Sequence, residues 1–206
     1  MVVLGLAGRI GTGKSKVSQF LCGLGAVAIS ADQIGHQSYL PNTQGWRDIV
    51  ATFGHDLVLP SGEIDRESLG SRVFGDSEAL AKLNSILHPQ MMKIIEEQIQ
   101  ELKRVGTDVV VLEAALLFEA NWTGLVDEVW VVTAPDDLTL QRVHDRNGLP
   151  EKLIRDRIQA QLPEEEQVRR AQVVIQNTAD LPSLELRVRD LWQKRILTRK
   201  ANNACK

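Results

Sequence analysis

The chain contains a glycine-rich segment, 8–15, that reads Gly-Arg-Ile-Gly-Thr-Gly-Lys-Ser. It follows an apolar run, 2–7, and precedes a helical pattern, 16–24. Glycines let backbone N–H groups turn toward an anion without obstruction by Cβ atoms, and a Lys and a Ser at these positions suit a polyphosphate and its Mg²⁺ ion. The positive end of the helix dipole adds to this attraction. We therefore predict a phosphate-binding loop of the Walker A type between a buried strand and a helix.

Short apolar runs elsewhere in the chain predict further strands of a parallel sheet covered by helices on both faces. These runs are 26–30, 109–112, 129–132 and 173–175. With the first run they make five strands, so we expect one α/β core formed by about 1–32, 105–141 and 171–200.

Residues 33–104 contain no convincing buried strand, and we predict a helical insertion there. Its leucine stripe ends at His88, and we expect Pro89 to begin a new helix, because proline is favoured at the first helical position. At 65–68 the sequence has the pattern of a helix start.

The segment after the fourth strand is expected to begin with a turn and N-cap pair at Pro135 and Asp136. A polar region follows, in which we predict two helices that break around Pro163. A last amphipathic helix should run to about residue 199, and we expect the tail, 201–206, to be frayed.

Composition excludes several classes of protein. The 206 residues are 43% hydrophobic, which is enough for a buried core, and the net charge of −3 gives no indication of a general nucleic-acid binder. No apolar run reaches the roughly 20 residues of a membrane span, and the first residues lack a basic signal-peptide region. Cys22 and Cys205 are expected to be ordinary thiols. We expect a cytoplasmic protein, monomeric or weakly homo-oligomeric.

Asp32 comes directly after the second strand, at the edge of the sheet where open α/β proteins bind ligands. Near the phosphate loop, its carboxylate is suited to accept the proton of an acceptor hydroxyl or to help bind Mg²⁺. The alternative is that Asp32 caps the helix that begins near Gln33.

Arg142 and Arg146 lie one helical turn apart and are candidates for neutralising the charge on a transferring phosphoryl group. The alternative for the arginines of this region is pairing with Glu164, Glu165 and Glu166 at the surface. His88 is suited either to anchor an anionic substrate or to cap a helix. The other histidines lack the spacing of metal ligands.

Several segments together resemble one family, the dephospho-coenzyme A kinases. They are Leu6 to Ser15, Ser30-Ala31-Asp32-Gln33-Ile34, His88-Pro89, Leu112 to Glu119, Arg142 to Leu149, Ile158-Gln159-Ala160-Gln161 and Val174-Ile175-Gln176-Asn177. The resemblance extends from Leu4 to about Trp192, and the ordered combination is far more specific than the phosphate loop alone.

The resemblance implies a three-layer P-loop kinase core with a five-stranded parallel sheet, a helical coenzyme A-binding insertion (33–104) and a helical lid (142–170). It implies ATP-dependent phosphorylation of the ribose 3′-hydroxyl of dephospho-coenzyme A, with Mg²⁺.

By position, the resemblance also assigns site residues. The ATP loop would be Gly11, Thr12, Gly13, Lys14, Ser15 and Lys16. Asp32 resembles the catalytic base, Arg142 and Asn177 the pair that flanks adenine, and Arg146 the lid arginine; Lys14 joins the catalytic set. The acceptor pocket would include His88, Leu116, Leu117, Phe118 and Glu119, and the metal ligands would be Ser15 and Asp32.

The chain departs from the family pattern at a few positions. Arg9 replaces a usual Gly, Lys16 a usual Thr and Ala115 a usual Pro, and Gln172 and Gln176 stand where acids are common. Two other functions remain open at this stage. One is another nucleoside or small-molecule kinase, and the other is a nucleotide-hydrolysing switch that signals through its insertion.

Overall fold

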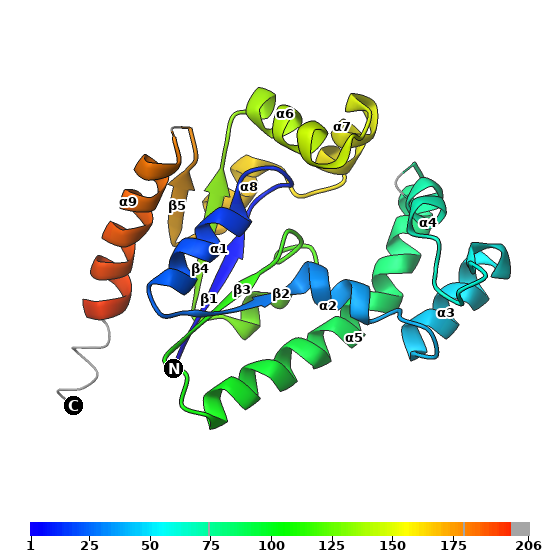
Figure 1. Cartoon of the computed structure of the whole chain (residues 1–206), viewed down its shortest axis with the longest axis horizontal. Helices are drawn as coiled ribbons and strands as arrows, with labels where there is room; N and C mark the ends of the chain where they lie inside the picture. Colours follow the sequence, from blue (N-terminus) through cyan, green and yellow to red (C-terminus); the bar gives the residue numbers. More distant parts are fainter. Residues whose placement is uncertain (74, 179, 199–206) are drawn as a thin grey trace.

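The computed structural model describes residues 1–73, 75–178 and 180–198, in which five parallel strands form one sheet (Figure 1). The strands are β1 (Val2–Ala7), β2 (Val27–Ser30), β3 (Val109–Glu113), β4 (Glu128–Thr133) and β5 (Val173–Gln176). Their spatial order is β2-β3-β1-β4-β5, so the first strand is central. The predicted five-stranded parallel sheet is confirmed, with each strand within one residue of its expected bounds.

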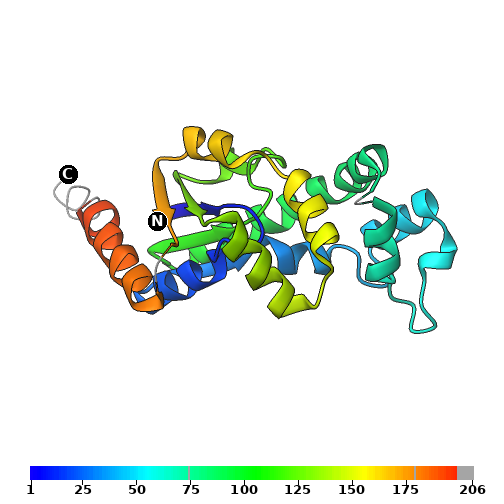
Figure 2. The same ribbon diagram turned by 90° about the horizontal axis from the view of Figure 1, so that it is seen from above.

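Helices cover both faces of the sheet, because alternate side chains of each buried strand point to opposite sides. Leu4, Leu6 and Trp130 belong to a buried cluster with residues of α1 (Lys14–Gly23) and α9 (Leu181–Leu191). On the other face, the strands pack with α2 (Ala31–Gln37) and α5 (Ser77–Arg104), and α8 (Glu164–Arg170) contacts β4. Figure 2 shows α8 and α1 on opposite sides of the sheet. The result is the predicted three-layer arrangement.

The predicted helical region contains α2, α3 (Gln44–Phe53), the 3₁₀ turn η1 (His55–Leu57), α4 (Arg66–Val73) and α5. Helix α4 begins where the sequence predicts, since Asp65 Oδ1 accepts hydrogen bonds from the backbone nitrogens of Glu67 and Ser68. Helices α3 and α4 lie away from the sheet, while the C-terminal part of α5 returns along it (Figure 1).

The expected helix break at Pro89 is wrong, because α5 is continuous through it. A proline inside a helix costs about 3 kcal/mol. The side chains of Leu87, Met91, Ile95 and Ile99, on both sides of the proline, are buried in one cluster. Each such burial contributes roughly 1.5–3 kcal/mol, so packing of the long helix outweighs the proline.

The chain from β4 to β5 forms α6 (Asp136–Asn147), α7 (Glu151–Gln159) and α8, and the expected break around Pro163 lies between the last two. The predicted cap at Asp136 is wrong. Pro135 holds the N-cap position of α6, and the Asp136 carboxylate instead pairs with Arg9. The Asp136 carboxylate therefore forms a long-range ion pair and does not cap the helix.

The final helix α9 continues as a π-helical segment, η3 (Trp192–Leu197). The predicted frayed tail and Cys205 lie outside the described residues, and Cys22 is an exposed free thiol. Within the described parts of the chain, every helix is too short or too polar to cross a membrane.

Residues 122–125 form a short 3₁₀ turn, η2 (Trp122–Leu125), between β3 and β4.

Candidate functional site

The phosphate loop connects the end of β1 to the start of α1, as the sequence predicts. Gly8, Gly11 and Gly13 have φ values of 137°, 81° and 99°, which side chains with a Cβ rarely adopt. A Cβ on Gly13 would lie 2.3 Å from Asn177 Nδ2, and one on Gly8 would lie 2.4 Å from Val132 O. The loop therefore requires glycine for its backbone angles and for its close contacts.

Asn177, which follows β5, holds the loop from the side. Its Nδ2 donates to Thr12 O at 2.8 Å, and its backbone nitrogen donates to Thr133 O at 2.7 Å. Thr12 is fully buried, and its hydroxyl donates to Arg9 O. Asn177 thus contacts the loop backbone directly.

Lys16 points away along α1, where its Nζ donates to Gln19 Oε1.

Lys14 is buried, and its Nζ donates to Gly8 O at 2.9 Å and to Arg9 O at 3.1 Å. Burial lowers the pKa of Lys14, while the negative charges of Asp32 and Glu113 act in the opposite direction. Arg146 and Glu119 also influence this ammonium group. The fold therefore brings Asp32 and Arg146 into the electrostatic surroundings of Lys14.

Among the charged residues around Lys14, Glu113 is the one to which the sequence pattern assigned no role. It ends β3, beside Leu6 of β1 and Ser30 of β2, and its Oε1 accepts a 2.6 Å hydrogen bond from Ser15 Oγ. An acid at the end of an apolar strand was the available signal. Nothing in the sequence places Glu113 against Ser15, because that contact depends on the order of the strands.

Asp32 is exposed and lies in the first turn of α2. The helix is capped by Ser30, whose Oγ accepts from Gln33 N, so the alternative interpretation of Asp32 as the cap is wrong. Ser15 contacts Glu113, not Asp32, with its hydroxyl. Within the described residues, no cluster of three or more His, Cys, Asp and Glu side chains forms a metal site.

Arg142 and Arg146 both lie on α6, but their surroundings differ. Arg142 is half-buried, and its Nη1 is buried without a hydrogen-bond partner among the described residues. Arg146 is exposed, and its Nε donates to Asn147 Oδ1. Arg169 and Arg170 pair with Glu166 at the surface, which is the alternative considered for this region.

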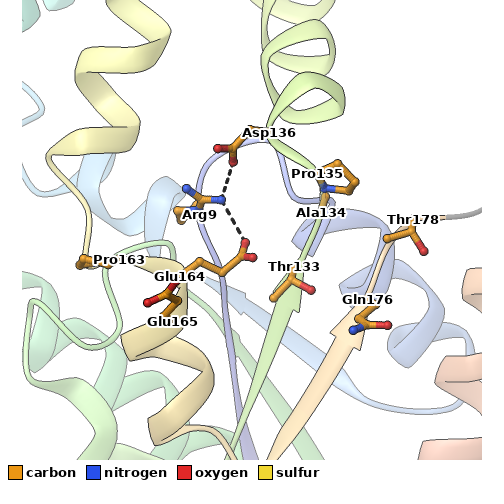
Figure 3. Close-up of a pocket in the computed structure, with 10 residues that line it drawn as sticks. All are labelled: Arg9, Thr133, Ala134, Pro135, Asp136, Pro163, Glu164, Glu165, Gln176 and Thr178. Carbon is orange, nitrogen blue, oxygen red and sulfur yellow. Dashed lines mark hydrogen bonds and ion pairs between the residues drawn. The ribbon is translucent and has the colours of Figure 1, made fainter.

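A cleft of about 700 Å³ opens beside the phosphate loop, beyond the ends of β4 and β5 (Figure 3). Its lining includes Thr133, Gln176 and Thr178 on one side and the ion-paired Arg9 on the other. Arg9 Nη2 donates to Asp136 Oδ1 at 2.6 Å and to Glu164 Oε2 at 3.1 Å. Arg9, which stands where the family pattern usually has Gly, therefore connects the phosphate loop to the starts of α6 and α8.

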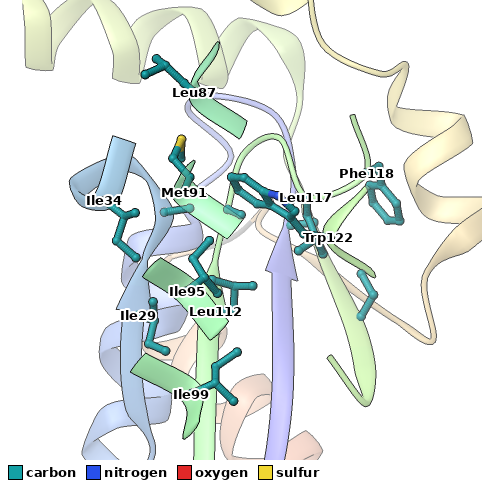
Figure 4. Close-up of a cluster of buried hydrophobic side chains, with 14 of the residues drawn as sticks. Ile29, Ile34, Leu87, Met91, Ile95, Ile99, Leu112, Leu117, Phe118 and Trp122 are labelled. Carbon is teal, nitrogen blue, oxygen red and sulfur yellow. The ribbon is translucent and has the colours of Figure 1, made fainter. Parts of the chain in front are cut away.

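The predicted acceptor residues after β3 divide into two kinds. Leu117 and Phe118 are buried in the same cluster as the core residues of α5 (Figure 4). Leu116 and Glu119 are half-buried. Glu119 Oε1 accepts a 2.6 Å hydrogen bond from Leu162 N. The buried side chains of Leu117 and Phe118 therefore anchor this loop to the hydrophobic core.

His88 lies inside the continuous helix α5, so the alternative that it caps a helix is wrong. Its ring meets Trp122 edge to face, with centroids 5.6 Å apart. Burial lowers the pKa of His88, because the charged imidazolium is poorly solvated there.

Comparisons with known proteins agree with this geometry. The family model for dephospho-CoA kinase matches residues 2–183. The chain belongs to the dephospho-coenzyme A kinase family. A dephospho-CoA kinase of Geobacter sulfurreducens is 45% identical over 95% of this chain and 100% of its own length. One from Carboxydothermus hydrogenoformans is 42% identical over 93% of each chain.

The structure of a dephospho-CoA kinase from Campylobacter jejuni matches with a TM-score of 0.68 and 28% identity, covering 96% of this chain and 98% of that one. The predicted family and the predicted P-loop kinase fold are therefore confirmed. Membership of a kinase family implies ATP as a substrate.

The loop geometry predicts the effect of Gly13→Ala. The new methyl group would meet Asn177 in a strained conformation, so we expect ATP affinity to fall at least about fivefold, because strain of this kind costs roughly 1–3 kcal/mol. Gly23→Ala is the matched control, since a Cβ at that position of α1 meets nothing within 4 Å. Calorimetric titration with ATP compares the two variants, and equal affinities would contradict the assigned role of Gly13.

The lowered pKa of His88 predicts a change in stability with pH. In the unfolded chain the imidazole binds a proton near pH 6.5, and in the folded protein it does so only at lower pH. The unfolded state therefore binds more protons as pH falls below about 6.5, and His88 destabilises the folded protein there.

We expect the melting temperature of His88→Gln to fall less than that of the unmodified protein between pH 7.5 and pH 5.5. His55→Gln, at an exposed position in η1, is the control and should keep the original slope. Thermal melts across this range make the measurement. Identical slopes for all three proteins would show that burial of His88 has no effect on its protonation.

Proposed function

We propose that this protein transfers the γ-phosphoryl group of ATP to the ribose 3′-hydroxyl of dephospho-coenzyme A, giving coenzyme A and ADP. The observation that carries the proposal is the buried Lys14 of the phosphate loop, with Asp32 and Arg146 in its electrostatic surroundings, in a chain of this family. A cation and a carboxylate that can accept a proton, both at one edge of a sheet, match the needs of phosphoryl transfer to a hydroxyl.

The residues of the loop would bind and polarise ATP. Backbone N–H groups of the segment 11–16 surround the phosphates, and Lys14 neutralises charge between the β- and γ-phosphates. Arg146 would neutralise charge on the group in transfer, and the half-buried Arg142 has an unpaired Nη1 that suits contact with the nucleotide. Asn177 would support the loop near the adenine.

Oxygen ligands for Mg²⁺ are present beside the loop. Ser15 and Glu113 share a hydrogen bond, and both Glu113 and Asp32 are close enough to the Lys14 ammonium group to affect its pKa. Hydroxyl and carboxylate oxygens of this kind fit a hard cation. We propose that Ser15 and Asp32 help to hold Mg²⁺, with Glu113 positioning the Ser15 hydroxyl. When bound, the ion would neutralise phosphate charge.

Asp32 would orient the acceptor hydroxyl and accept its proton. A ribose hydroxyl is a weak nucleophile, and a carboxylate within hydrogen-bond reach both directs it and removes its proton as the new bond to phosphorus forms. The exposure of Asp32 supports this role, because an acceptor molecule must be able to reach the carboxylate.

The helical insertion and the loop after β3 would bind dephospho-coenzyme A. His88 and the half-buried Leu116 and Glu119 are the proposed contacts, and the buried Leu117 and Phe118 would shape that pocket from beneath. The segment 142–170 would form the lid, with α8 as its anchored end because it packs against β4.

We also propose that the enzyme works in the cytoplasm as a monomer or weak homo-oligomer and without nucleic acid. The net charge of −3 supports the last point, since nucleic-acid binders carry an excess of basic residues.

The substrate assignment is tested by following ADP formation from ATP and Mg²⁺. We expect ADP to form when dephospho-coenzyme A is added and to be at background with a panel of nucleosides and sugars. Excess EDTA should abolish the reaction, and phosphate analysis should place the new group on the ribose 3′-oxygen. ADP formation that is independent of acceptor would contradict the proposal and indicate a hydrolase.

The role of Asp32 is tested with Asp32→Asn, which keeps the shape of the side chain and removes its charge. We expect turnover to fall at least about a hundredfold, the lower end for loss of a general base, with a much smaller change in ATP affinity. Asp137→Asn is the matched control, because Asp137 is an exposed aspartate in the first turn of α6. Turnover, ATP binding and melting temperature are measured on both. An active Asp32→Asn enzyme would rule out the catalytic assignment.

A further inference from the structure

The segment that joins α7 to α8, residues 160–163, lies between two loops that are far from it in sequence. One is the phosphate loop, and the other is the loop after β3, residues 114–119. We call the segment the α7–α8 connection. Each of these two loops forms at least one hydrogen bond with it, and the same side chain contacts both.

That side chain is Gln161. Its Oε1 accepts a hydrogen bond from Ile10 N at 2.9 Å, and its Nε2 donates to Ala115 O at 3.2 Å. A single carboxamide therefore bridges the phosphate loop and the loop after β3. Both bonds join residues that are distant in sequence: Ile10 is 151 positions from Gln161, and Ala115 is 46 positions from it.

A carboxamide side chain can make both bonds at once. Ile10 N requires an acceptor and Ala115 O requires a donor, and the carboxamide supplies one of each at fixed separation. A carboxylate would keep the contact with Ile10 and place a second acceptor against the Ala115 carbonyl. An aliphatic side chain would lose both contacts and leave two half-buried backbone groups without these partners.

Neighbouring contacts strengthen the attachment of the connection at both ends. Leu162 N donates to Glu119 Oε1 at 2.6 Å, within the loop after β3. Glu164, which begins α8, pairs with Arg9 of the phosphate loop (Figure 3). The connection thus has two hydrogen bonds to the loop after β3 and one to the phosphate loop, where the Arg9–Glu164 ion pair adds a contact from α8. Among the described side chains of the connection, only that of Gln161 contacts both loops.

We propose that Gln161 is a positioning residue that sets the distance between ATP on the phosphate loop and the acceptor beside the loop after β3. The inference rests on the proposed function, which places the two substrates on these loops. Phosphoryl transfer depends chiefly on alignment, and misplacement by about 1 Å can reduce a rate about a hundredfold. Neither contact involves a substrate, so loss of the bridge affects alignment more than the affinity for either substrate alone.

Three variants test this role. Gln161→Ala removes both bonds, and Gln161→Glu keeps the contact with Ile10 N alone. Gln159→Ala is the matched control, because Gln159 is an exposed glutamine two residues earlier whose side chain makes no hydrogen bond with the described residues. The kcat and the KM for each substrate are measured with melting temperatures, so that a folding defect is separated from a loss of alignment.

We expect kcat to fall at least about tenfold in Gln161→Ala and by a smaller factor in Gln161→Glu, relative to Gln159→Ala. The KM values for ATP and dephospho-coenzyme A should change by less than about threefold. A kcat of Gln161→Ala within about threefold of the control would overturn the proposal. So would a lower melting temperature with unchanged kcat, which is the result expected of a merely structural residue. If Gln161→Ala does not fold, the same criteria apply to Gln161→Glu.

Amide hydrogen exchange on the substrate-free protein tests the bridge without relying on the reaction. We expect faster exchange in segments 8–15 and 114–119 of Gln161→Ala and no change in Gln159→Ala, because Ile10 N loses its acceptor. Unchanged exchange in both segments would overturn the bridge itself. Absence of any acceptor-dependent ADP formation by the unmodified protein would instead overturn the proposed function, and with it the catalytic part of this inference.

Discussion

The position of the phosphate loop at the end of the central strand is the constraint on which the rest of the site depends. Because β1 lies between β3 and β4, residues that follow each of these neighbours reach the loop from opposite sides. Glu113 approaches Ser15 from β3, and Asp136 approaches Arg9 from the segment after β4. Asn177, beyond β5, reaches the loop through its side chain. A loop whose glycines have positive φ angles is thus supported by contacts from β3 and from the segments after β4 and β5.

Charge balance is the second constraint, and it centres on Lys14. A buried ammonium group is costly unless carboxylates or other acceptors compensate for its lost hydration. Here two loop carbonyls accept its hydrogen bonds, and Asp32 and Glu113 supply negative charge nearby. In the proposed function, Lys14 would bind phosphates, and the carboxylates would bind a metal ion and an acceptor hydroxyl. The proposed function would thus use for phosphoryl transfer the same residues that compensate for the burial of Lys14.

Much of the fold could be predicted because its signals are local. Continuous apolar runs identify all five strands, and the glycines of the loop reveal its backbone conformation. The errors occurred where a local preference competes with distant packing. Pro89 favours a helix start, yet burial of Met91 and Ile95 keeps α5 continuous. Asp136 suits a helix cap, yet Arg9 takes its carboxylate.

The sequence by itself determined the strands, the phosphate loop and the family, because glycine, proline and apolar periodicity act on the backbone within a few residues. Tertiary structure alone decided that Glu113 contacts Ser15 and that Gln161 joins Ile10 to Ala115. These partners are separated by between 46 and 151 residues. Such pairs form only after the strand order and the helix packing have brought their backbones together, so no pattern of neighbouring residues encodes them.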